Sequence, residues 1–255
     1  MMRGERSFRI DRQILLFLDY DGTLTDFKNE PQAATLSPAR RLLLERLARK
    51  NWVCIVSGRS LAEIRRMVGV AGIAYIGNHG LEIQWNRRTW VHPGALRRRS
   101  TLRAVLESIE LRSRGIASRR IEDKRLTASI HFRQMTPSDK RRMKRIARTE
   151  MKTASQSLML REGNNVWEIR PRVPWDKGKA VKEIRHWIGC DQGSLAIYVG
   201  DDRTDEDAFR ELRKRGGLSF KVGYQGKTEA LGRISDVDAV WRFLMAFLMP
   251  ERPRK

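Results

Sequence analysis

Short apolar runs alternate with helix-periodic segments at both ends of this chain. Residues 13–18, 52–56, 73–76 and 195–199 are almost entirely apolar, and each run stops at a polar residue or a glycine. Runs of this length without polar alternation are typical of strands that are buried on both faces of a parallel sheet. A fifth, shorter strand is predicted at 218–222.

The segments between these strands predict helices. Ser37 and Pro38 supply an N-cap and a first-turn proline for a helix that reaches about Lys50. Ser60 caps a second, short helix through Met67. Three further helices are predicted at 177–188, 204–215 and 237–249. Alternating strands and helices of this kind predict an α/β fold, in which helices cover both faces of a parallel sheet.

The middle of the chain, from about residue 83 to 170, has a different pattern. It predicts two hairpins, one strand of alternating polarity and two helices, at 83–91, 158–169, 126–132, 102–111 and 137–154. The second hairpin turns at Gly163-Asn164-Asn165. We therefore predict an α+β domain at 83–170, inserted into a core that is formed by residues 1–82 and 171–255.

Length and composition fit this division. The chain has 255 residues, of which 40% are apolar and 32% charged, so it can bury a core of ordinary size. No apolar run approaches the roughly 20 residues of a membrane helix, and the opening segment 1–13 has no apolar signal-peptide region. Two cysteines, Cys54 and Cys190, cannot form a disulfide framework or a cysteine zinc site. These features predict a cytoplasmic protein with no membrane partner.

The net charge of +22 indicates an anionic partner or a strongly solvated surface. The basic residues are spread over most of the chain and form no long tail, and only 7% of residues are aromatic. Stacking platforms for single-stranded nucleic acid are therefore scarce. We interpret the excess charge as a solvated surface, and nucleic acid is not favoured as a partner.

Polar clusters follow three of the predicted core strands. They are Asp19-Tyr20-Asp21-Gly22-Thr23-Leu24, Ser57-Gly58-Arg59 and the acidic run Gly200–Asp207. The carboxyl ends of parallel strands meet at one edge of a sheet, so these clusters are expected to lie together. Facing carboxylates repel one another unless a divalent cation lies between them, and Mg²⁺ prefers such oxygen ligands. A calcium loop over Asp19–Glu30 is excluded, because Leu24 stands where that loop needs glycine.

Four motifs in this order carry a family resemblance. They resemble the motifs of the haloacid dehalogenase superfamily of phosphotransferases. The four motifs are DYDGTL at 19–24, SGR at 57–59, DKG at 176–178 and GDDRTDED at 200–207. The resemblance implies a Rossmann-like parallel-sheet core, with the inserted domain acting as a cap that selects the substrate. GNHGLE, EDK, HFR, VWEIRP and GDDRTDEDAF are similar, more narrowly, to the trehalose-6-phosphate phosphatases of that superfamily.

The resemblance implies roles for the core residues. Asp19 would be the nucleophile, Asp21 the general acid and then the general base, Ser57 a donor to a phosphoryl oxygen, and Lys177 the neutralising cation. The implied cofactor is Mg²⁺, with Asp201 as the direct carboxylate ligand and the backbone carbonyl of Asp21 as a further ligand. Asp202 and Asp205 would lie next to these ligands, and Asp19 beside the ion. The implied metal-site residues are Asp19, Asp21, Asp201, Asp202 and Asp205.

The resemblance also implies a substrate site shared by core and cap. The residues it assigns there are Thr23, Gly58, Arg59, His79, Glu82, Glu122, Lys124, Arg133 and Glu168. Glu122, Lys124 and Glu168 would bind sugar hydroxyls, because carboxylates accept and ammonium groups donate hydrogen bonds. Zinc is not expected, since neither His79 nor His131 has a second histidine at ligand spacing.

The implied function is Mg²⁺-dependent hydrolysis of trehalose 6-phosphate to trehalose and phosphate, in trehalose biosynthesis, with this small molecule as the partner. Two alternatives stay open at this point. One is a phosphatase of the same architecture that acts on another sugar or sugar-acid phosphate. The other is a basic nucleic-acid-binding protein on a phosphatase scaffold.

Overall fold

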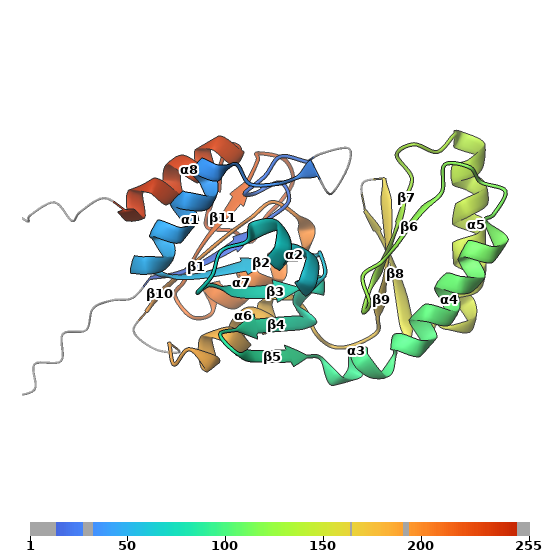
Figure 1. Ribbon diagram of the computed structural model, residues 1–255, viewed down its shortest axis with the longest axis horizontal. Coiled ribbons are helices and arrows are strands. Elements are labelled where there is room, and N and C mark those ends of the chain that lie inside the picture. The colour runs from blue at the N-terminus through green and yellow to red at the C-terminus, as the bar shows by residue number, and fades with distance from the viewer. Residues whose placement is uncertain (1–13, 28–32, 164, 191–193, 249–255) are drawn as a thin grey trace, which may run out of the picture.

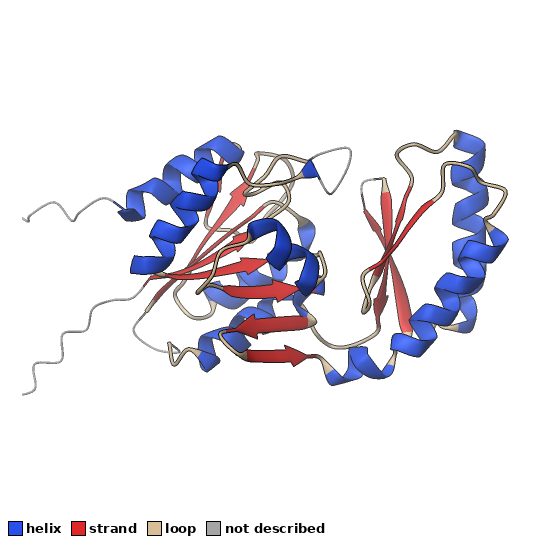
Figure 2. Cartoon of the chain, viewed as in Figure 1, coloured by secondary structure: helices blue, strands red, loops and turns tan. Residues whose placement is uncertain are grey.

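A computed structural model describes residues 14–27, 33–163, 165–190 and 194–248 of the chain. Within these ranges the chain forms two sheets with helices packed on them, side by side (Figures 1 and 2). We call the eight-stranded sheet the core sheet and the four-stranded sheet the cap sheet. Some predicted positions lie outside the described residues, namely the opening segment 1–13 with Gln13, and Glu30, Asn164 and Met249.

The core sheet is parallel except at one edge. Its strands are β1 (Ile14–Asp19), β2 (Trp52–Val56), β3 (Ala74–Gly77), β4 (Glu82–Trp85), β5 (Arg88–Val91), β10 (Leu195–Gly200), β11 (Leu218–Val222) and β12 (Gly232–Ile234). Their order is β12-β11-β10-β1-β2-β3-β4-β5, and only β4 and β5 run antiparallel to their neighbours. The strand β12 has no counterpart in the sequence-based prediction.

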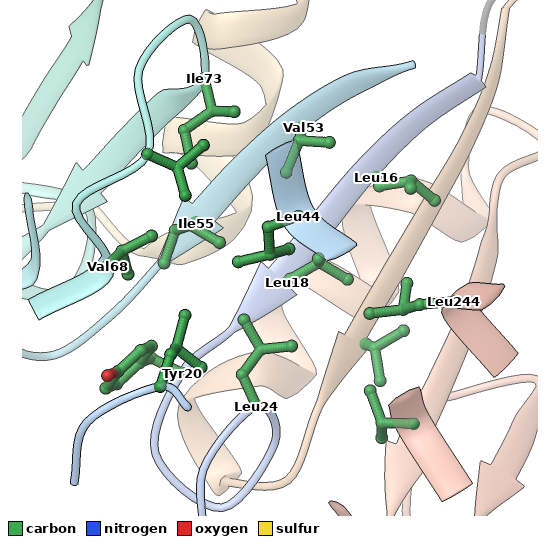
Figure 3. Packing of buried hydrophobic residues seen from close by; sticks show 14 of the residues in the cluster. Leu16, Leu18, Tyr20, Leu24, Leu44, Val53, Ile55, Val68, Ile73 and Leu244 are labelled. Atoms are coloured by element: carbon green, nitrogen blue, oxygen red, sulfur yellow. The ribbon is translucent and has the colours of Figure 1, made fainter. Parts of the chain in front are cut away.

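Helices cover both faces of the core sheet. One face packs against α1 (Pro38–Lys50), α2 (Leu61–Val68) and α8 (Val237–Met245), and the other against α6 (Lys177–Trp187) and α7 (Glu206–Arg213). Figure 3 shows Leu16 and Leu18 of β1 meeting Leu44 of α1 and Leu244 of α8. The alternate β1 residues Leu15 and Phe17 pack on the opposite face. The continuous apolar strands are therefore explained by burial on both sides, and the predicted α/β fold is confirmed.

The helix starts follow the predicted caps. The Ser37 hydroxyl accepts a hydrogen bond from the Arg40 amide before α1, and the Ser60 hydroxyl accepts one from Glu63 before α2. The predicted helix at 204–215 is divided into η3 (Arg203–Asp205) and α7. The last helix is similarly followed by a short turn, η4 (Ala246–Leu248).

The hairpin at 83–91 differs from its predicted place. It was expected in the inserted domain, but β4 pairs with β3 and extends the core sheet. Ile83 is fully buried in the core, and Trp85 and Trp90 pack against the same cluster, so this apolar face continues the core instead of the cap. The predicted boundary at residue 83 therefore falls inside the core sheet.

The cap sheet is antiparallel and is covered by helices on one face only. Its strands are β6 (Arg120–Asp123), β7 (Ala128–His131), β8 (Leu158–Gly163) and β9 (Val166–Pro171), in the order β6-β7-β9-β8. Helices α4 (Arg99–Arg112) and α5 (Pro137–Thr153) bury one face through an apolar cluster that includes Trp167. The other face is turned toward the core sheet (Figure 1). This one-sided burial explains the alternating polarity of the cap strands.

Two linkers join the sheets close together. The chain enters the cap through the short helix α3 (Pro93–Arg97) and returns after β9. Ala95 of α3, Val91 at the end of β5, and Val173 and Trp175 after β9 pack with Leu81 and Leu126. Leu126 was predicted to begin a strand, but it lies in the turn before β7 and packs at the linkers instead. In the described part of the chain, no helix combines the length and apolarity needed to cross a bilayer.

Candidate active site

A cavity of about 820 Å³ lies between the two sheets. The core sheet lies beside the cap sheet (Figure 2), and residues at or just after the carboxyl ends of β1, β2 and β10 line the cavity, namely Asp19, Gly58 and Asp202. Asp19, Asp21 and Lys177 line its core wall, and Glu122 and Glu168 line its cap wall. The fold thus brings together the motif clusters that the sequence places far apart.

Lys177 joins two strand ends at the bottom of this cavity. Its side chain is almost fully buried, and Nζ donates to Asp19 Oδ1 at 2.8 Å and to Asp205 Oδ1 at 2.7 Å. Burial alone would lower the pKa of Lys177, but the charges of Asp19 and Asp205 raise it above its usual value. Asp176 caps α6 by accepting from the Lys179 amide, which fixes Lys177 at the first helical position. Lys177 is therefore a fixed, permanent cation beside Asp19.

Asp19 belongs to a group of three carboxylates. Asp19, Asp201 and Asp205 each place an oxygen within 4.8 Å of the others. Burial raises the pKa of Asp19, and the charges of Asp205 and Asp201 add to this effect while Lys177 opposes it. Burial and the charges of Asp205 and Asp202 raise the pKa of Asp201 to about 7. A divalent cation would offset this repulsion, and carboxylate oxygens are the ligands that Mg²⁺ prefers, so the residues present fit the ion.

Asp205 differs from the other two carboxylates. It is fully buried, and its Oδ1 accepts from Lys177 and from the Tyr198 hydroxyl at 2.6 Å. Its Oδ2 accepts from the Asp202 amide at 2.9 Å. Because both oxygens are already hydrogen-bonded, Asp205 positions Lys177 and the turn after β10. Asp19 and Asp201 are left as the carboxylates that can face an ion.

Two predicted metal-site residues lie beside this group and not within it. The Asp202 side chain caps η3 and accepts from the Thr204 hydroxyl at 3.2 Å. The Asp21 side chain lines the cavity and forms an ion pair with Arg59. Close packing of the first motif depends on Gly22, where a side-chain Cβ would lie 2.3 Å from Asp201 Oδ2. Gly22 also has a φ of +81°, which favours glycine.

Arg59 holds Asp21 with both arms of its guanidinium. Nε and Nη2 donate to the two oxygens of Asp21 at 2.8 and 2.7 Å, and Nη1 donates to Glu63 at 2.5 Å. The Arg59 side chain is only 8% exposed and lies against the Tyr20 ring. This bidentate geometry fixes the orientation of the Asp21 carboxylate.

Ser57 and Thr23 are placed behind the cavity surface. Ser57 is 1% exposed, and its hydroxyl accepts a hydrogen bond from the Arg59 amide at 3.1 Å. Thr23 is fully buried, and its hydroxyl lies 3.5 Å from Asp201 Oδ1. Neither side chain is among those that line the cavity, whereas Gly58 next to Ser57 does line it.

The strand register aligns the polar residues of the cap wall. Glu122 of β6 is paired with Ser129 of β7, Ser129 with Glu168 of β9, and Glu168 with Arg161 of β8. Directly paired residues point to the same face of a sheet, and these four all line the cavity. Glu122 also pairs with His131 at 3.1 Å, and its pKa lies below the usual value. Burial alone would raise the pKa of Glu122, but the contacts with His131 and Lys124 outweigh burial and lower it.

Glu168 is surrounded by donors from both sheets. Its Oε1 lies 2.9 Å from His79 Nε2 and 3.8 Å from Lys124 Nζ, and its Oε2 pairs with Arg170. Burial would raise the pKa of Glu168, but these neighbours hold it well below its usual range. Burial and the charge of Arg170 lower the pKa of His79 to about 4. A neutral His79 that donates from Nε2 to Glu168 and accepts from Arg170 at Nδ1 fits both contacts.

Glu82 was predicted to bind substrate, and the structure places it elsewhere. It is 4% exposed, does not line the cavity, and its Oε2 accepts from the Leu61 amide and from Asn78 Nδ2. The carboxylate is used to hold the start of α2, because that amide is otherwise unpaired at the helix N-terminus. Arg133, which was also predicted to bind substrate, lines the cavity.

Residues 17–231 match the model of the trehalose-phosphatase family. The chain belongs to this family. A probable trehalose-phosphate phosphatase E of Arabidopsis thaliana is 33% identical over 246 residues, which cover 91% of this chain and 69% of that protein. The chain spans about two thirds of the length of the curated relatives it matches. The family is one of phosphoric monoester hydrolases, so the predicted enzyme class is confirmed.

Solved structures agree with the family assignment. A trehalose-6-phosphate phosphatase related protein superposes with a TM-score of 0.80 at 26% identity, over 92% of this chain and 97% of that one. A haloacid dehalogenase-like hydrolase from Bacteroides thetaiotaomicron has a TM-score of 0.64 at 14% identity, over 92% and 98% of the two chains. The second likeness confirms the haloacid dehalogenase-like fold.

Several cavity residues of this trehalose-phosphatase family member were not predicted from the sequence. They are Phe27, Arg120, Ser129, His131, Arg161, Arg170 and Arg203. The alternation of β7 is a signal that could have found Ser129 and His131, because they alternate with the apolar residues Ala128 and Ile130, which are buried in the cap cluster. No comparable signal marks Arg203, which lies on the 3₁₀ turn after β10.

Proposed function

We propose that this protein hydrolyses trehalose 6-phosphate to trehalose and phosphate in a Mg²⁺-dependent reaction that proceeds through an aspartyl-phosphate on Asp19. One observation carries the proposal. A single cavity joins a carboxylate held against a buried lysine to a cap wall of carboxylates and an ammonium group suited to sugar hydroxyls. The names of the relatives agree with this substrate.

Asp19 is the proposed nucleophile. An oxygen of its carboxylate forms a bond to phosphorus while the bond from phosphorus to the sugar oxygen breaks. Lys177 stabilises the negative charge of the phosphoryl group and keeps the Asp19 carboxylate oriented. In the second step a water oxygen attacks phosphorus, the bond to Asp19 breaks, and phosphate leaves. Ser57 and Gly58, which directly follow β2, are the proposed phosphate contacts. Gly58 lines the cavity, whereas the Ser57 hydroxyl lies behind its surface and must be uncovered before it can donate to a phosphoryl oxygen.

Asp19 and Asp201 are the residues we propose to hold Mg²⁺, with Asp202 and Asp205 orienting the loop around them and Asp21 nearby. When bound, the ion would supply charge neutralisation for the carboxylates and the phosphoryl oxygens. Thr23, which lies beside Asp201, would fix the orientation of that ligand.

Asp21 is the proposed general acid and base. It gives a proton to the departing sugar oxygen in the first step, and it takes one from the attacking water in the second. In this structure Arg59 occupies both oxygens of Asp21, so at least one of these bonds must open before Asp21 can protonate the leaving group. Arg59 can hold the Asp21 carboxylate between the two steps, after Asp21 has given its proton to the sugar oxygen and before it takes one from the attacking water.

The cap domain is proposed to select the disaccharide. Glu122, Lys124 and Glu168 offer acceptors and donors for hydroxyl groups, with His79 behind Glu168 and Arg133 at the cavity edge. Cap closure over the substrate would exclude water from the reacting phosphate. We also propose a cytoplasmic location, in which Cys54 and Cys190 stay as the free thiols that the structure shows.

Phosphate release from a panel of sugar phosphates tests this function. We expect turnover of trehalose 6-phosphate well above that of glucose 6-phosphate, and loss of turnover when Mg²⁺ is chelated. Higher turnover on another sugar or sugar-acid phosphate would replace the proposed substrate but keep the reaction. Activity that survives chelation would contradict the proposed role of Mg²⁺.

A further inference from the structure

We propose that Phe27 is a specificity-determining residue, whose phenyl ring packs against the sugar ring that carries the phosphate. The inference rests on the proposed function, and it concerns a residue to which no role has been assigned. It adds an apolar contact from the core domain to the hydroxyl contacts proposed for the cap.

Phe27 is an exposed aromatic residue on the wall of the cavity. It is 66% exposed, and it lines the cavity between the two sheets. The other large apolar side chains that are exposed in the described part of the chain do not line this cavity. Among the described residues that do line it, Phe27 supplies the only phenyl, phenol or indole ring. Covering such a ring removes apolar surface from water, so Phe27 can stabilise a ligand that presents an apolar face.

The turn after β1 determines where Phe27 lies. The Leu24 amide donates to the Tyr20 carbonyl at 2.9 Å, and the Gly22 amide donates to the Thr25 carbonyl at 2.8 Å. The chain folds back in this turn, so that Thr25 forms a β-bridge with Asp21 two residues before Phe27. The phenyl ring consequently lies against Gly22, where an added Cβ would be 2.6 Å from Phe27 Cε2.

The position beside Gly22 indicates which part of the substrate Phe27 can reach. The same added Cβ would lie 2.3 Å from Asp201 Oδ2, so the phenyl ring and this carboxylate are neighbours. Asp201 lies with Asp19 where the phosphate is proposed to react, whereas Glu168 lines the cap wall. A sugar phosphate that reacts at Asp19 therefore has its phosphorylated ring near Phe27 and its second ring toward the cap.

A sugar ring offers the apolar face that this contact needs. The hydroxyl groups of a pyranose point mainly outward from its rim, and they leave C–H groups on its two faces. These C–H groups are attracted to the negative face of an aromatic ring. A phosphate ester that contains no ring has no such face, so Phe27 should favour cyclic substrates over acyclic ones.

Phe27→Ala tests the inference, with Phe27→Tyr as the variant that keeps the ring. We expect Phe27→Ala to lower kcat/KM for trehalose 6-phosphate on the order of 5- to 30-fold, through the lost burial of apolar surface. Glucose 6-phosphate should lose a similar factor, because it has the same phosphorylated ring. Glycerol 3-phosphate, which has no ring, should stay within about two-fold of its wild-type value. Phe27→Tyr should stay near wild type on all three substrates.

Tyr224→Ala is the matched control, because Tyr224 is 71% exposed but does not line the cavity, and it should keep wild-type values on all three substrates. Any of three results overturns the inference: wild-type kcat/KM for Phe27→Ala on trehalose 6-phosphate, a loss confined to the disaccharide, or an equal loss on glycerol 3-phosphate. The wild-type protein alone reports on the proposed function. If its best substrate is a different sugar phosphate, the variant ratio is measured with that sugar, so the two failures are distinguished.

Discussion

At the scale of single residues, the site is defined by charges that the fold forces together. Asp19 and Asp201 are acids whose burial disfavours ionisation, while Lys177 is a cation that its two acidic neighbours keep protonated. Such opposed shifts are typical of functional sites. The arrangement makes clear predictions for charge-removing variants and for pH.

Asp19→Asn should abolish turnover while the protein stays folded. An amide cannot attack phosphorus, so we expect kcat to fall on the order of 10³-fold or more. Phosphate release and circular dichroism on the same sample check this. Substantial residual activity in a folded, pure variant would remove Asp19 as the nucleophile.

Binding of Mg²⁺ should weaken below about pH 7. The pKa of Asp201 in the metal-free protein is raised to about 7, so below that pH the ion must displace a proton. We expect the affinity to fall by up to about tenfold per pH unit below 7 and to level off above it. Calorimetric titration with Mg²⁺ between pH 5.5 and 8 measures this change.

Asp202→Asn is the matched control for that titration. The pKa of Asp202 lies below its usual value, because Lys177 and the Arg203 amide outweigh its burial, so it is ionised throughout this range. The variant should still bind Mg²⁺, with its pH profile moved to lower pH because the Asp202 charge helps to raise the pKa of Asp201, whereas Asp201→Asn should lose the ion altogether. A wild-type affinity that does not change with pH contradicts the role given to Asp201.

At the scale of elements, strand ends and strand faces place the chemistry. The core strands deliver Asp19, Ser57 and Asp201 at one edge of the sheet, since each residue directly follows or ends an apolar strand. The cap strands deliver alternate residues to one face, since helices bury the other. The two sheets therefore contribute different chemistry, and variants should separate it.

Glu168→Ala should slow the hydrolysis of trehalose 6-phosphate without slowing that of a small phosphate ester. The variant loses one or two hydrogen bonds to a charged group, each worth about 1.5–3 kcal/mol. We expect kcat/KM for trehalose 6-phosphate to fall about 10- to 150-fold, with little change for p-nitrophenyl phosphate or in the Mg²⁺ requirement.

Glu107→Ala provides the control, because Glu107 lies on α4 and is exposed to solvent. It should behave as the wild type on both substrates. A parallel fall on both substrates in Glu168→Ala would instead assign Glu168 to closure of the cap.

At the scale of the whole molecule, one turn of the cap is attached to the core. Asn78 Nδ2 donates to the Lys124 carbonyl at 3.0 Å, and the Thr127 hydroxyl donates to Asn78 Oδ1 at 2.6 Å. Leu126, between them, packs with the two linkers. Asn78 has a φ of +48° and is fully buried, so its position is fixed by the core. This corner keeps Lys124 beside Gly58.

Thr127→Val tests the coupling of cap and core at this corner. Removing the hydroxyl without changing the shape should raise KM for trehalose 6-phosphate by about 3- to 10-fold and cost about 1 kcal/mol of unfolding free energy. Thr127→Ser keeps the hydroxyl and should keep the wild-type KM. Steady-state kinetics and urea unfolding measure both effects, and identical KM values for the two variants would refute the coupling.

The sequence by itself determined the elements of this protein and the order of its motifs. Strand burial, helix periodicity and the serine caps depend on residues close together in the chain, so β1, β2, α1 and α2 were predicted nearly to the residue. The motif order also indicated the superfamily and the residues that converge on Asp19. These features needed no knowledge of which sheets would form.

Only the tertiary structure decided how distant residues are paired. Lys177 meets Asp19 across 158 positions and Arg59 meets Asp21 across 38, and neither pairing follows from local pattern. The hairpin β4–β5 extends the core sheet because its apolar face is buried there. Glu82 accepts a hydrogen bond from the Leu61 amide at the start of α2 instead of binding substrate. Ser129 entered the cavity wall through strand register, which is fixed when the cap face is buried as a whole.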